Sequence, residues 1–126
     1  MSFRIELFVD DVDASIRFYT DALGFRLVRR EPDYASLDRG GAVLGLAPAA
    51  KLPADGEGPG FTRAGLAGRR GAGVEIVLEV EDVDAALEAV GRAGHRVAEP
   101  LRERPWGLRD FRVIDPDGYY LRITHA

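Results

Sequence analysis

Two stretches of this chain repeat one pattern of apolar and polar residues. The first covers residues 3–19 with the sequence FRIELFVDDVDASIRFY, and the second covers residues 74–90 with the sequence VEIVLEVEDVDAALEAV. Both contain Asp-Val-Asp-Ala, which begins at Asp11 in the first stretch and at Asp82 in the second. A repeat within 126 residues predicts two similar supersecondary units in one body. We expect a ligand to bind where the two units face each other.

The composition limits the classes of function open to the chain. A hydrophobic fraction of 46% and a charged fraction of 30% are typical of a soluble globular protein with one core. The chain has no cysteine, which rules out disulfides, thiolate metal ligands and a cysteine nucleophile. No apolar run approaches the ~20 residues that span a bilayer, and the first residues lack a secretion signal. The net charge of −4 disfavours nucleic acid. We therefore expect a cytoplasmic protein with neither a membrane nor a nucleic acid as partner.

Alternation, helical spacing and turn residues divide the chain into two units with the same order of elements. The first unit is expected to contain a strand, a helix and three strands, at residues 3–9, 12–23, 25–30, 34–39 and 42–47. The second repeats this order at residues 74–80, 83–92, around 96, 110–114 and 119–124. The first unit thus covers residues 1–47 and the second 73–126. Residues 48–72, rich in Gly, Pro and Ala, form either a linker or a flap over a site, and a plain linker is the simpler interpretation.

Two motifs make the chain similar to a known superfamily. One is DVDASIRFY at residues 11–19, followed by LGF at 23–25, and the other is WGLRDFRVIDPDG at 106–118. Together they resemble the vicinal oxygen chelate superfamily, which includes glyoxalase I, extradiol dioxygenases, fosfomycin resistance enzymes and bleomycin resistance proteins. The resemblance covers nearly the whole chain. It implies an α+β fold in which two βαβββ units with curled mixed sheets form a cleft. It also implies a homodimer, in which units can be exchanged between chains, but no particular activity.

In the metal-dependent members of this superfamily, four positions in the cleft supply His or Glu ligands. The resemblance assigns to them Arg4, Gly45, Glu75 and Arg122, with Gly45 the least securely aligned. A catalytic metal needs about three imidazole or carboxylate ligands, and arginine offers no lone pair near neutral pH. Only Glu75 can ligate a metal, so we expect neither a metal nor another cofactor. The two histidines, His95 and His125, fall outside the four positions and are interpreted as surface residues.

The same region predicts a polar network in place of a metal. The alternation of side chains along each strand predicts which residues face the helices, namely Ile5, Leu7, Val9, Val74, Ile76, Leu78 and Val80. The residues predicted to face the concave side are Arg4, Glu6, Phe8, Glu75, Val77 and Glu79. An ion pair between Arg4 and Glu75, or between Arg122 and nearby carboxylates, would tie the two units together. For Glu6 and Glu79, exposure to solvent on an open sheet face is an equally good interpretation.

Four aromatic residues are expected on or beside the concave faces, namely Phe8, Tyr34, Trp106 and Tyr120. Flat rings along a groove bind planar or cationic molecules, and carboxylates in the groove of an acidic protein favour a cation. For each ring alone a structural role is simpler, with Trp106 anchoring a dimer interface and each tyrosine in the core. The predicted ligand-binding residues are Arg4, Glu6, Phe8, Tyr34, Glu75, Glu79, Trp106, Arg112, Tyr120 and Arg122.

The aspartates of the chain are explained by local structure rather than by a metal site. Those near the two helix starts, including Asp11 and Asp82, are interpreted as caps, and Asp115 and Asp117 as turn residues.

The resemblance is greatest to the metal-free bleomycin resistance branch. The predicted function is therefore metal-free binding of a small organic molecule, a drug or secondary metabolite, for sequestration or resistance. One alternative is a metal-dependent lyase, isomerase or dioxygenase with an atypical ligand set, in which Glu75 is joined by Glu6 or His125. Another is metal-free acid and base catalysis by Glu75 beside Arg4 or Arg122.

Overall fold

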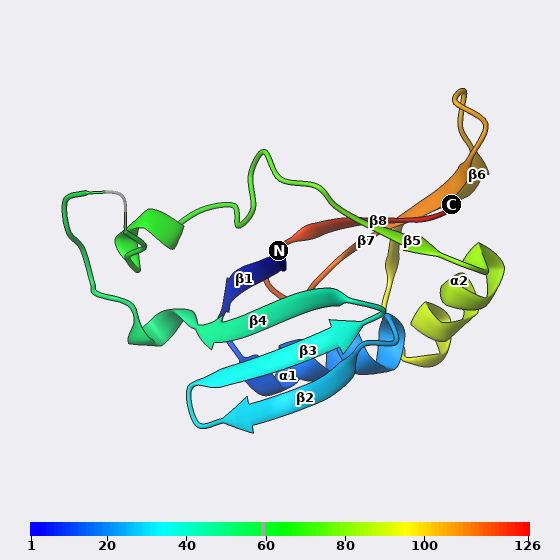
Figure 1. Cartoon of the computed structure of the whole chain (residues 1–126). Coiled ribbons are helices and arrows are strands. Elements are labelled where there is room, and N and C mark those ends of the chain that lie inside the picture. Colours follow the sequence, from blue (N-terminus) through cyan, green and yellow to red (C-terminus); the bar gives the residue numbers. More distant parts are fainter. Residues whose placement is uncertain (59) are drawn as a thin grey trace.

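The two units of the computed structural model repeat one order of elements (Figure 1). The structure describes residues 1–58 and 60–126. The first unit consists of β1 (Arg4–Val9), α1 (Val12–Arg17), the π-helical turn η1 (Phe18–Ala22), β2 (Arg26–Glu31), β3 (Tyr34–Arg39) and β4 (Ala42–Pro48). The second consists of β5 (Ile76–Val80), α2 (Val83–Arg92), β6 (Val97–Glu103), β7 (Arg109–Ile114) and β8 (Tyr120–His125). Two short 3-10 helices, η2 (Ala49–Lys51) and η3 (Ala64–Leu66), lie between the units.

Each unit forms a mixed four-stranded sheet with the same topology. The strand orders are β1-β4-β3-β2 and β5-β8-β7-β6. In each sheet the first strand pairs in parallel with the last, and the remaining pairs are antiparallel. Helix α1 packs on β3 and β4, and α2 packs on β6, β7 and β8, so that each helix covers one face of its own sheet. The paired βαβββ architecture predicted from the sequence is confirmed.

The two helices begin in the same way because both copies of the repeat carry an aspartate at the N-cap. The side chain of Asp11 accepts a hydrogen bond from the Ala14 N–H at 3.1 Å, and Asp82 accepts one from the Ala85 N–H at 3.0 Å. These contacts satisfy backbone donors that the first helical turn leaves without partners. The prediction that these two residues are caps is confirmed.

One core spans both units, because the covered faces of the two sheets turn their apolar residues toward the same helices. The buried core residues of the strands include Leu7, Val9, Leu44, Leu46, Ile76, Val80, Leu121 and Ile123. Those of the helices include Phe18, Tyr19, Val83 and Val90. Strand parity therefore predicted the covered face of β1 and β5 correctly. Val74 is the exception, with 55% of its surface exposed, because it precedes the first residue of β5.

The turn at residues 115–118 joins the second unit to the first. Tyr19 donates its hydroxyl to Asp115 Oδ2 at 2.7 Å, and the Asp10 N–H donates to Asp117 Oδ1 at 2.7 Å. Burial raises the pKa of Asp115, although its hydrogen bonds from Tyr19 and the backbone work against that rise. Burial and the neighbouring Asp115 carboxylate raise the pKa of Tyr19 well above its usual value. Sequence analysis interpreted both aspartates as turn residues alone; they also hold the units together.

A cavity marks the place where the repeat has diverged. The registers that make Gly45 and Arg122 equivalent place Gly40, five residues before β4's Gly45, at the position of Asp117 in the longer turn of the second unit. Gly40 therefore stands where the second unit has Asp117, and it cannot make an equivalent side-chain contact to the other unit. Gly40 lines a cavity of about 600 Å³ between the units, together with Gly24, Glu79 and Ala86.

Within the described residues, no helix is both long enough and apolar enough to cross a membrane.

Candidate functional site

The open face of the second sheet brings together a glutamate and two arginines. Arg122 on β8 lies directly opposite Arg112 on β7, and Glu75 lies just before β5. Arg122 Nη2 is 3.0 Å from Glu75 Oε1, and Arg112 Nη1 is 3.7 Å from Glu75 Oε2. Two like charges facing each other across strands repel, and the shared carboxylate offsets that repulsion.

A buried aspartate holds Arg112 from the other side. Asp110 has no solvent exposure and accepts hydrogen bonds from Arg112 Nε at 3.2 Å and Arg104 Nε at 2.9 Å. Burial by itself would raise the pKa of Asp110, but the bonds from Arg104 and Arg112 outweigh it and hold the pKa below its usual value. Asp110 is therefore a fixed anion, and it orients Arg112 toward the open face.

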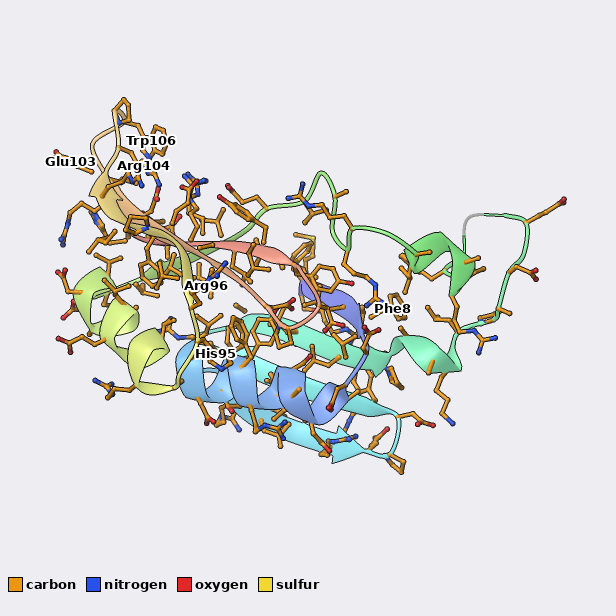
Figure 2. The ribbon with its side chains drawn as sticks, turned by 180° about the vertical axis from the view of Figure 1, so that it is seen from behind. Phe8, His95, Arg96, Glu103, Arg104 and Trp106 are labelled. Carbon is orange, nitrogen blue, oxygen red and sulfur yellow. The ribbon has the colours of Figure 1, made fainter. Side chains whose placement is uncertain are left out.

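Two aromatic rings complete this group of side chains. Tyr120 accepts a hydrogen bond from Arg112 Nη1 at 2.8 Å, and the Arg112 Cζ lies 5.9 Å from the centre of the Tyr120 ring. Arg122 Cζ lies 5.9 Å from the centre of the Trp106 ring, and 56% of Trp106 is exposed. Figure 2 shows Trp106 on the projecting connection between β6 and β7, next to Arg104. We call Glu75, Trp106, Arg112, Tyr120 and Arg122 the arginine–aromatic cluster.

The first unit has a smaller polar group at the equivalent place. Arg4 Nε lies 2.7 Å from Glu6 Oε1, and Tyr34 donates its hydroxyl to the same oxygen at 2.9 Å. Both Glu6 and Tyr34 lie above Gly45, where a Cβ atom would overlap them. Glycine at this position therefore makes room for the Glu6 and Tyr34 side chains.

The strand registers show which residues of the last strands of the two units correspond. Glu6 pairs with Gly45 in the first sheet, and its repeat equivalent Val77 pairs with Arg122 in the second. Gly45 and Arg122 are therefore equivalent, as the sequence alignment proposed.

The expectation of an ion pair between Arg4 and Glu75 is wrong. Arg4 pairs with Glu6 of its own strand, and Glu75 pairs with Arg112 and Arg122 of its own unit. An arginine takes the carboxylate within its reach, and here each unit supplies one locally. The expected pairing of Arg122 with a neighbouring carboxylate is confirmed, but it does not tie the units together.

The other two predicted residues lie apart from the cluster. The Phe8 ring packs against Phe61 with 4.6 Å between the centroids, beside a cavity of about 360 Å³ that Glu6 and Tyr119 also line. Figure 2 shows Phe8 well separated from Trp106. Glu79 is exposed and lines the cavity between the units.

The donor set does not fit a superfamily metal. Among the described residues, no group of three or more His, Asp or Glu side chains is placed to hold a metal ion. His95 packs edge-on against Phe18 at 4.8 Å, and His125 Nε2 accepts the Arg109 N–H at 3.1 Å. Arginine and glycine at three of the four positions offer no lone pair.

Sequence analysis missed three residues that shape the site or its surroundings, namely Arg104, Asp110 and Arg70. Asp110 lies within the motif at residues 106–118, and the parity of β7, which places it on the same face as Arg112, is the signal that points to it. Arg70 binds Asp10, Asp117 and the Phe8 carbonyl across a long sequence separation, which no local pattern reveals.

Comparison with known proteins agrees with this architecture. The family model of the Glyoxalase/Bleomycin resistance protein/Dioxygenase superfamily matches residues 3–123. A bleomycin resistance protein of Geobacillus stearothermophilus is 32% identical over 117 residues, covering 86% of this chain and 84% of that protein. The crystal structure of TioX from Micromonospora sp. ML1 is similar with a TM-score of 0.78 and 26% identity, over 99% of this chain and 98% of that one. A lactoylglutathione lyase structure from Agrobacterium tumefaciens shares the fold with a TM-score of 0.74 and 21% identity, over 100% of this chain and 93% of that one. On the extent of these matches, the chain belongs to the glyoxalase/bleomycin resistance protein/dioxygenase superfamily.

Proposed function

We propose that this protein binds a small planar organic molecule, a drug or secondary metabolite, without a metal and for sequestration or resistance. The observation that carries the proposal is the arginine–aromatic cluster. Its two rings and two guanidinium groups offer flat stacking surfaces beside hydrogen-bond donors. A relative named a bleomycin resistance protein supports the same class of function.

Metal-free binding is supported by the identity of the residues at the four superfamily positions. Of Arg4, Gly45, Glu75 and Arg122, only Glu75 carries a carboxylate, and Arg112 and Arg122 already neutralise it. A cation would have to compete with two arginines for this single ligand.

A homodimer is part of the proposal. The open side of the second sheet leaves Val77 40% and Ile114 48% exposed, and the Trp106 ring is exposed as well. Exposed apolar side chains on a sheet face are costly to leave in water, and a second chain of the same sequence supplies an equivalent face to cover them.

Acid and base catalysis is the alternative that a specific observation favours. Glu75 lies 3.0 Å from Arg122, so a carboxylate and a guanidinium are already adjacent on an open face. An enzyme of this kind would turn over its ligand without added metal, and Glu75→Gln would abolish that turnover while leaving binding in place.

The test uses the single tryptophan of the chain. Planar compounds titrated into chelator-treated protein should quench Trp106 fluorescence. Adding Zn, Fe, Mn or Ni should leave the affinity unchanged and cause no product to form. Calorimetry with Trp106→Ala should show about tenfold weaker binding, because losing an aromatic contact costs about 1.4 kcal/mol.

Phe61→Ala is the matched control, because it removes an aromatic ring of 60% exposure that lies outside the cluster. Equal affinity in Trp106→Ala and the wild type would remove Trp106 from the site. Binding or turnover that requires one metal per chain would replace the proposal with the metal-dependent enzyme.

A further inference from the structure

The carboxylates on the open face of the second sheet are already held by arginines. Glu75 is within 3.7 Å of both Arg112 and Arg122. Asp110 is within 3.2 Å of both Arg104 and Arg112, and it is fully buried. A cationic ligand would have to take a carboxylate away from a guanidinium group, which leaves a half-buried arginine without its partner.

Arg122, in contrast, has donor capacity to spare. Its Nη2 contacts Glu75, while its Nε is buried and finds no hydrogen-bond partner among the described residues. A guanidinium group carries five N–H donors, and a carboxylate matches two of them at once. An unpaired buried donor is costly, so this atom favours any ligand oxygen that reaches it.

Glu75 is the member of the cluster that is free to leave. It precedes the first residue of β5, outside the hydrogen-bonded ladder, and 37% of its side chain is exposed. Asp110 cannot be displaced in the same way, because it is buried and bound by two arginines. Glu75 therefore occupies the place that a carboxylate from solution would take.

Building on the proposed function, we propose that the ligand is a planar organic anion whose carboxylate displaces Glu75 from Arg122 and Arg112. The ring of the anion packs against Trp106, which already lies beside Arg122. When Glu75 swings into solvent, Arg122 keeps no carboxylate among the described residues, and the incoming anion restores charge balance.

The experiment compares three probes with one ring system and different charge, namely 2-naphthoate, 2-naphthamide and 2-naphthylmethylammonium, by calorimetry at fixed ionic strength. Wild-type protein should bind 2-naphthoate most tightly. Glu75→Gln should strengthen 2-naphthoate binding by about tenfold, since it removes the competing carboxylate. Arg122→Gln should weaken the same binding by at least about tenfold, with Arg122→Lys intermediate because it keeps the charge but not the fork.

The matched controls come from the opposite face of the same strand. Arg109 of β7 binds Asp84 of α2 at 3.0 Å, so Arg109→Gln and Asp84→Asn break an ion pair of the same type away from the cluster. Both should leave the affinity for 2-naphthoate unchanged. Circular dichroism checks the fold of every variant, and Glu75→Gln keeps the test decisive if an Arg122 variant is unstable.

The sign of the Glu75→Gln effect separates the possible outcomes. Weaker 2-naphthoate binding in this variant, or equal binding of the anion and the amide by the wild type, would overturn the anion proposal and leave planar-ligand binding standing. Tightest binding of 2-naphthylmethylammonium, lost in Glu75→Gln, would establish a cation site instead. Failure of all three probes to bind either protein would count against both proposals.

Discussion

At the scale of single residues, two buried aspartates, Asp110 and Asp115, lie in opposite environments. Asp110 is surrounded by guanidinium groups, which hold its pKa below the usual value despite burial. Asp115 is buried against a tyrosine hydroxyl and backbone N–H groups, and burial raises its pKa above the usual value of 3.8. Asp110 therefore stays ionised and supports the cluster, whereas the burial of Asp115 between the two units costs desolvation free energy.

The residue-scale prediction concerns the Tyr19 hydroxyl, which stabilises the ionised form of Asp115. Tyr19→Phe should lower the free energy of unfolding by about 2 kcal/mol near neutral pH, because Asp115 loses a buried charged hydrogen bond. The raised pKa means that wild-type stability from Asp115 falls as the pH rises through that value. The hydroxyl opposes this fall, so the effect of the substitution should be largest above the raised pKa and shrink as the pH falls through it. Urea unfolding at several pH values measures both.

Tyr34→Phe provides the control for that experiment. Its hydroxyl also donates to a carboxylate, but Glu6 is exposed, so the change in stability should stay within about 0.5 kcal/mol. A Tyr19→Phe effect that does not depend on pH would contradict the role assigned to Asp115.

At the scale of elements, the segment between the units does more than connect them. Arg70 donates to the Phe8 carbonyl at 3.0 Å and pairs with Asp10 at 2.8 Å and Asp117 at 3.3 Å. One arginine therefore binds both β1 and the turn between β7 and β8. Phe61, earlier in the same segment, packs on Phe8, so the segment covers part of β1 as a flap would.

The element-scale prediction is that Arg70→Ala frees this segment. Loss of about 1.4 kcal/mol of charged hydrogen bonding should raise the rate of chymotrypsin cleavage near Phe61 roughly tenfold. Mass spectrometry of the fragments locates the cut. Arg63→Ala, on the same segment, should cleave at the wild-type rate; an equal rise in both variants would mean that Arg70 is not the anchor.

At the scale of the whole molecule, the two sheets share one core but leave their other faces open. The helices of both units meet in that core, where η1 packs against α2. The arginine–aromatic cluster lies on one open face and the Glu6–Tyr34 pair on the other. In the proposed dimer, a second chain would cover these faces.

The whole-molecule prediction is a dimer that Ile114→Lys disrupts. Sedimentation velocity of the wild type should give about twice the chain mass of 13.8 kDa, and the variant should give the chain mass. A lysine at this 48% exposed position replaces an exposed apolar side chain of the proposed interface with a charge. Val28→Lys, at a similarly exposed position of β2, should remain dimeric. A wild type that sediments as one chain would contradict the dimer.

The sequence by itself determined the repeat, the order of elements, the covered face of β1 and β5, and that an aspartate, Asp11 or Asp13 in the first unit, caps each helix. These features depend on neighbouring residues: Asp11 caps the helix that begins next to it, and alternation fixes which side of a strand is apolar. The resemblance to the superfamily assigned the four cleft positions, and the strand registers agree that Gly45 and Arg122 are equivalent.

The tertiary structure alone decided which charges meet. Glu75 takes Arg112 and Arg122, Asp115 accepts the Tyr19 hydroxyl, and Arg70 reaches Asp117, because charged groups take the nearest partners in space. Spacing along the chain does not report those distances when the partners lie on different elements. A periodic pattern therefore determines elements and faces, whereas the partner of each buried charge depends on how the two units dock.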